Sequence, residues 1–125
     1  MIAGVVNDRL EAVVELSVSG PAGQPLEIEA VVDTGFTGFL TLPPTVVAEM
    51  ELPEVGDSIF ILADGSITTL LAHGAFVLWD GQMRLIQVDA SGSIPLVGMA
   101  LLAGHNLNID VQPGGSVLIN SDQVA

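Results

Sequence analysis

Glycine, proline and Asp-Gly turns divide this sequence into short apolar runs, and that division leaves few folds open to the chain. In Val14–Ser19, apolar and polar residues alternate with the period of a half-buried strand. Leu26–Val32 alternates first and then becomes continuously apolar, as a strand does when it enters a core. Gly20–Gly23 predicts the turn between them, and Asp33 follows directly after the second strand.

Two Asp-Gly pairs lie between apolar runs, and each predicts a β-hairpin. The first pair, Asp64-Gly65, and the second, Asp80-Gly81, lie in the middle region of the chain. We expect Trp79, beside the second pair, to cap its hairpin. The expected hairpin strands are Ile59–Leu62 with Ile67–Leu71 and Ala75–Trp79 with Met83–Val88.

The remaining predicted elements are short. They are a strand at Thr37–Leu42, a helix of about two turns within Pro43–Met50, a buried strand at Pro95–Gly98, a helix at Met99–Ala103 and a hairpin of Asn108–Val111 with Ser116–Ile119. The pattern therefore predicts a mainly β barrel or sandwich with one or two short helices. The length of 125 residues and the absence of a repeat or linker predict one domain, residues 1–125, with a core from about residue 10 to 119.

The charge is strongly one-sided, with two basic residues against 15 acidic ones and a formal net charge of -13. Such a chain has no cationic stripe to neutralise phosphates, which argues against nucleic acid and anionic membranes as partners. Half of the residues are hydrophobic, so we expect some apolar surface to be buried between subunits. The first residues lack a basic leader followed by an apolar stretch, which predicts a cytoplasmic location.

The residues that usually bind metals are sparse. Cysteine is absent, which removes disulfides and thiolate chemistry. His73 and His105 lack the paired spacing of metal ligands, and we expect both at the surface or the edge of the core. The sequence therefore predicts neither a metal nor a cofactor.

Asp33-Thr34-Gly35 is the main candidate for a functional motif in the sequence. A carboxylate after two apolar strand residues must be hydrogen-bonded, paired or neutralised. Gly35 permits a tight turn and lets backbone N–H groups approach that carboxylate. By itself the tripeptide favours an ordinary strand-ending turn in which the aspartate bonds its own backbone.

The wider context of the tripeptide resembles a known family. The run from Leu26 to Leu40, with Asp33-Thr34-Gly35 inside it, resembles the active-site segment of retroviral-type (retropepsin-like) aspartic peptidases. Pro95-Leu-Val-Gly-Met-Ala-Leu-Leu resembles the second signature of that family, and the Ala63–Ser66 hairpin lies about where the family carries its flap. The resemblance implies a closed acid-protease barrel with one lobe per chain.

The resemblance also implies roles for single residues. Asp33 would be the catalytic carboxylate, Thr34 would link two active-site loops through its hydroxyl, and Gly35 would help to hold the substrate backbone. The residues implied in substrate binding are Phe36, Thr37, Ala63, Asp64, Gly65, Ser66, Val97 and Gly98. Aspartic peptidases need two carboxylates that share one proton, and this chain has one such aspartate, so a homodimer is implied.

Phe36 and Thr37 depart from the viral pattern, in which a small and an acidic residue follow the glycine. Phe36 would narrow or reshape the pocket beside the two carboxylates, so the substrate preference of viral enzymes does not transfer to this chain.

Three functions remain open at this point. The first is an aspartic endopeptidase that cuts extended peptides, with an acidic optimum because the dyad needs a proton and acid relieves the repulsion between two acidic chains. The second is a dimeric binding or assembly module that keeps the fold without cleaving. The third is a monomeric acidic β-domain with a structural role.

Overall fold

The computed structural model of the chain describes residues 1–21 and 23–121, which form mostly strands. Two short helices, α1 (Pro44–Glu49) and α2 (Met99–Leu102), accompany them. The strands are β1 (Ile2–Val6), β2 (Ala12–Ser19), β3 (Leu26–Val32), β4 (Leu40–Leu42), β5 (Glu54–Ile61), β6 (Ile67–Trp79), β7 (Gln82–Ala90), β8 (Leu96–Val97), β9 (His105–Ile109) and β10 (Ser116–Ser121).

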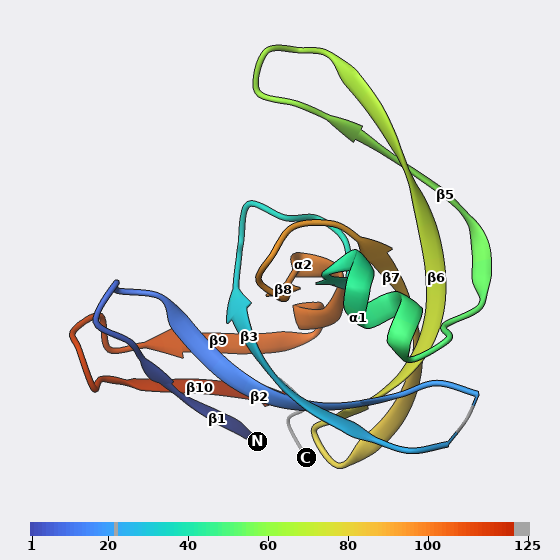
Figure 1. The fold of residues 1–125 in the computed structure, drawn as a ribbon. Coiled ribbons are helices and arrows are strands. Elements are labelled where there is room, and N and C mark those ends of the chain that lie inside the picture. Colours follow the sequence, from blue (N-terminus) through green and yellow to red (C-terminus); the bar gives the residue numbers. More distant parts are fainter. Residues whose placement is uncertain (22, 122–125) are drawn as a thin grey trace.

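One sheet closes on itself to form a barrel. The strand order is β5-β6-β7-β4-β8-β3-β2-β1-β10-β9, and β6 also pairs with β2. This extra pairing closes a ring of β2, β3, β8, β4, β7 and β6. Outside the ring, β1, β10 and β9 continue the sheet from β2, while the hairpin of β5 with the first half of β6 projects well beyond the barrel (Figure 1).

The two-residue strand β8 brings distant parts of the chain together. It pairs in parallel with β3, where Val32 lies opposite Val97, and antiparallel with β4, where Leu40 lies opposite the same valine. Asp33 and Gly98, the residues that follow these paired valines, therefore leave the barrel at the same end. Parallel neighbours that lie 65 residues apart in the sequence cannot be inferred from local pattern alone.

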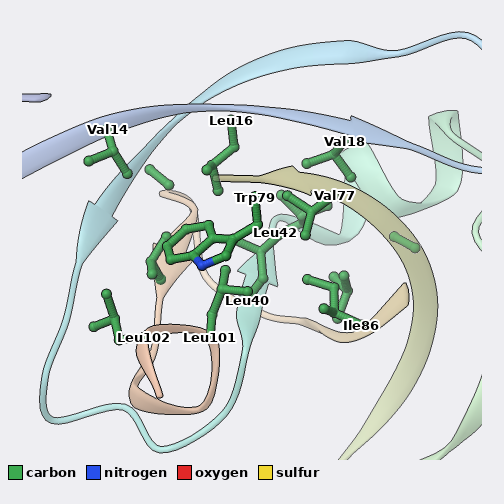
Figure 2. Close-up of a cluster of buried hydrophobic side chains, with 14 of the residues drawn as sticks. Val14, Leu16, Val18, Leu40, Leu42, Val77, Trp79, Ile86, Leu101 and Leu102 are labelled. Carbon is green, nitrogen blue, oxygen red and sulfur yellow. The ribbon is translucent and has the colours of Figure 1, made fainter. Parts of the chain in front are cut away.

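The barrel interior is filled by branched aliphatic side chains around one indole. Trp79 is 2% exposed and lies at the centre of the cluster, between Leu16 on one side and Leu40 and Leu101 on the other (Figure 2). The expectation that Trp79 caps a hairpin was wrong. Strand alternation turns this residue inward, next to Val77, while Leu78 faces outward.

Most predicted elements are confirmed, but β1 was not predicted, and the strand predicted at Asn108–Val111 is β9, which spans His105–Ile109. Only Leu40–Leu42 of the predicted strand Thr37–Leu42 is a strand, because the carbonyls of residues 36, 38 and 39 accept hydrogen bonds from the start of α2 instead of a neighbouring strand. The strands predicted at Ile67–Leu71 and Ala75–Trp79 are parts of a single strand, β6, which passes through Gly74 without interruption.

Within the described residues, no helix has both the length and the apolar character needed to cross a membrane.

Candidate active site

Asp33 lies immediately after β3, at the end of the barrel where β3 and β8 both stop. Its backbone N–H donates to the carbonyl oxygen of Val97 at 2.8 Å, which continues the parallel pairing of β3 with β8 by one residue. The residue is half-buried, whereas Thr34 and Gly35, which follow it, are exposed. The sheet therefore holds the backbone of Asp33 while its side chain stands at the edge of the solvent.

A tight turn orients the Asp33 carboxylate. The N–H of Phe36 donates to the Asp33 carbonyl at 3.1 Å, and the N–H of Gly35 donates to Asp33 Oδ1 at 2.9 Å. A Cβ at Gly35 would lie 3.2 Å from that oxygen, so a side chain there would crowd the carboxylate. This arrangement satisfies one carboxylate oxygen within its own loop, and it fits both a catalytic aspartate and a structural turn.

Gly98 lies at the same end of the barrel and packs closely against the loop that follows β3. No larger residue fits at this position. A Cβ on Gly98 would lie 2.2 Å from the carbonyl oxygen of Gly38 and 2.5 Å from Cδ2 of Phe36. The backbone of α2 thus approaches the loop closely enough for three hydrogen bonds. They run from Gly98 N–H to Phe39 O at 3.0 Å, from Met99 N–H to Phe36 O at 2.8 Å and from Ala100 N–H to Gly38 O at 3.1 Å.

Val97 contributes to the site through its backbone. Its side chain is fully buried in the barrel core. The resemblance implies that Val97 helps to bind substrate, and in this structure its carbonyl accepts the backbone N–H of Asp33. Thr37, in contrast, is exposed on the loop.

Residues Ala63 to Ser66 form the tip of the β5–β6 hairpin. We call the whole hairpin the flap. Gly65 has φ +83°, a conformation that favours glycine. The carboxylate of Asp64 accepts the Ser66 hydroxyl at 2.6 Å and the Ser66 N–H at 2.9 Å. These two hydrogen bonds, chiefly the one from the Ser66 hydroxyl, hold the pKa of Asp64 below its usual value of 3.8, although the group is fully exposed. The flap tip is therefore ordered by its own polar contacts.

An aromatic contact joins the flap to the loop between β3 and β4, residues 33–39, which we call the candidate catalytic loop. The rings of Phe36 and Phe60 are stacked, with centroids 6.4 Å apart and planes 28° from parallel. Phe60 lies in β5, before the tip, and the sequence did not single it out. The run Ile59-Phe60-Ile61 is apolar throughout, so the pattern alone does not tell which side chain turns toward the loop.

A hollow of about 390 Å³ opens beside the start of the candidate catalytic loop. Asp33 and Thr34 line it together with Leu10, Ile109 and Val111. Leu10 and Val111 are 56% and 65% exposed. Apolar side chains thus border the candidate catalytic residue at the protein surface.

The part of the chain that the structure describes contains no group of three or more histidine, cysteine, aspartate or glutamate residues arranged to bind a metal ion.

Comparison with known proteins supports the reading of the fold. The chain is similar to a retropepsin-like aspartic protease from Rickettsia conorii, with a TM-score of 0.64 and 18% identity over 95% of this chain and 88% of that one. No family model matches the sequence, and neither does any curated protein. The chain therefore has a closed, mainly β, retropepsin-like fold with two short helices, as the two signatures and the hairpin predict.

Proposed function

We propose that the chain is an aspartic endopeptidase that works as a homodimer, with one Asp33 from each subunit. The observation that carries this proposal is the placement of Asp33. It stands half-exposed where β3 leaves a retropepsin-like barrel, with its backbone hydrogen-bonded to β8 and its carboxylate oriented by Gly35. The projecting flap lies on the same side as the loop, since Phe60 contacts Phe36.

Dimerisation follows from the number of catalytic groups. The sequence contains a single Asp-Thr-Gly, and the chemistry needs two carboxylates at contact distance that share one proton. A two-fold axis beside Asp33 supplies the second one. The exposed apolar side chains of Leu10 and Val111, next to Asp33 and Thr34, support this arrangement because a subunit interface would cover them.

In the proposed mechanism, one Asp33 is ionised and its partner is protonated. The ionised carboxylate takes a proton from a water held between the two, and that water attacks the scissile carbonyl, which the protonated carboxyl polarises. The resulting tetrahedral intermediate collapses as the leaving nitrogen receives a proton, so no covalent bond to the enzyme forms. The Gly35 N–H fixes the carboxylate orientation throughout.

The substrate would be an extended peptide held between the catalytic loop and the flap. Extended chains bind in strand-like fashion, with main-chain hydrogen bonds supplying affinity and side-chain pockets supplying selectivity. The flap would close over the bound peptide and exclude bulk water. We expect the chain to act as a single domain in the cytoplasm.

The test is cleavage of an unbiased peptide mixture from about pH 3 to about pH 8, with the molecular mass recorded under the same conditions. The wild type is compared with Asp33→Asn, which preserves an oxygen for the Gly35 N–H but removes the titratable group. Asp57→Asn is the matched control, because Asp57 is exposed on β5 and outside the proposed site. We expect cuts by a dimeric wild type and by Asp57→Asn, and none by Asp33→Asn.

The same experiment separates the two other functions. Peptide binding by an inert dimer, unchanged in Asp33→Asn, would favour the binding module. The strand order offers that module two candidate docking edges, since β5 and β9 end the sheet. A protein that stays monomeric and inert at every pH would favour a structural domain.

A further inference from the structure

The ring of Phe36 rests directly on the backbone of two glycines. A Cβ on Gly38 would lie 2.5 Å from Cζ of Phe36, and a Cβ on Gly98 would lie 2.5 Å from its Cδ2. Real side-chain contacts are longer than this, so glycine at both positions makes room for the ring. Phe36 therefore occupies a closely packed site formed by the catalytic loop and the start of α2.

Phe60, which lies on the flap, packs against the same ring. It stacks on Phe36 at 6.4 Å between ring centroids, a distance typical of favourable aromatic pairs. The Phe36 ring thus packs against both glycine backbone and a second aromatic ring. A side chain held in this way cannot turn aside to admit a bulky group without breaking the contact to the flap.

The pair stands at the boundary of the space that a substrate would occupy. Phe36 is three residues after Asp33 and is joined to it by the 3.1 Å hydrogen bond of the turn. Phe60 belongs to the hairpin that would cover the peptide. A peptide strand lying between Asp33 and the flap must pass beside these two rings.

We propose that Phe36 and Phe60 form an aromatic wall that restricts substrates to peptides with small side chains, such as glycine, alanine or serine, at the position facing the wall. The inference rests on the proposed peptidase function and names its substrate class. In a two-fold dimer the wall occurs twice, so the restriction applies on both sides of the scissile bond.

The test uses peptide pairs that differ by alanine or leucine at one position near the cut, assayed with wild type, Phe36→Ala and Phe60→Ala. The ratio of kcat/KM for the leucine peptide to that for the alanine peptide should rise at least about ten-fold in Phe36→Ala, since a pocket enlarged by several carbons discriminates on that scale. Phe60→Ala should shift the ratio in the same direction. Phe76→Ala, which shortens an exposed phenylalanine on β6, is the matched control and should leave the ratio unchanged.

Three outcomes decide the proposal. A wild type that prefers small residues, together with a relaxed preference in both variants, supports the wall. An active wild type whose preference is the same in Phe36→Ala and Phe60→Ala overturns it and leaves the peptidase proposal standing. A wild type that cuts no peptide overturns the peptidase function, and the wall with it. Phe60→Ala keeps the test independent of folding, because Phe60 lies on the projecting hairpin, outside the buried core.

Discussion

Replacement of Gly98 by alanine tests whether the close approach of α2 to the catalytic loop builds the site. Gly98 has φ −103°, which any residue adopts, so the substitution causes no backbone strain of its own. The added Cβ would lie 2.2 Å from the Gly38 carbonyl oxygen, where contacts under 3.0 Å essentially never occur. The obstacle is backbone, so the loop must withdraw by roughly 1 Å.

The withdrawal has a cost in stability and a cost in activity. It stretches the hydrogen bonds, 2.8 to 3.1 Å long, by which the start of α2 binds the loop carbonyls. Overpacking of this kind costs about 1–3 kcal/mol, which for a domain of this size lowers Tm by about 4–12 °C. Because Asp33 belongs to the same loop, a shift of roughly 1 Å should also lower kcat/KM by about 100-fold.

Thermal unfolding by circular dichroism and peptide cleavage measure the two costs, and Gly38→Ala is the comparison. Its Cβ meets the Phe36 ring and not the backbone, so removal of that ring should rescue it. We expect Gly38→Ala and Phe36→Ala to be non-additive by at least about 0.5 kcal/mol. Gly98→Ala should stay destabilising in the Phe36→Ala background. A Gly98→Ala protein with wild-type Tm and activity would refute the reasoning.

Four further predictions concern the flap tip, the core, the dimer and the pH dependence of cleavage. Asp64→Ala removes both bonds to Ser66, so amide hydrogen exchange at the flap tip should accelerate, as measured by mass spectrometry. Because the folded pKa of Asp64 lies below its unfolded value of 3.8, those bonds stabilise the tip above about pH 4. They are lost as the pH falls through the lowered folded pKa, so the protection factor of the wild-type tip amides, corrected for the intrinsic pH dependence of exchange, should fall only in that acid range. Leu101→Ala empties a fully buried site and should cost about 2–5 kcal/mol in denaturant unfolding. Thr34→Val should weaken the dimer in sedimentation analysis if its hydroxyl links the two loops, whereas an unchanged dissociation constant would exclude that role. Cleavage should peak at acidic pH, and added salt should promote dimerisation near neutrality because two chains of charge -13 repel each other; activity that rises steadily toward alkaline pH would contradict the shared-proton dyad.

The sequence was sufficient to predict features that depend on neighbours along the chain. Leu26–Val32 alternates and then turns apolar, and β3 has those bounds. Asp64-Gly65 predicts the flap turn, in which glycine adopts φ +83°. Asp33 was expected where a strand ends, and it lies there because β3 stops at Val32. Local backbone preference and side-chain alternation determine all of these.

Other features required the fold, because they depend on residues far apart in sequence. The strand pattern did not tell whether Trp79 points into the barrel, and only closure of β6 onto β2 places it at the centre of the core.

The residues of the candidate site also divide into those predicted from the sequence and those that only the fold brings together. The resemblance of two sequence segments to retropepsin-like peptidases singled out Asp33-Thr34-Gly35 and Gly98 as candidate site residues. Tertiary structure decided that β8 lies between β3 and β4, which brings Gly98 against Gly38 and seats the Phe36 ring. It also decided that Phe60 is the flap residue that meets that ring. The physical reason is that period and propensity act over a few residues, whereas packing depends on which surfaces the closed sheet brings into contact.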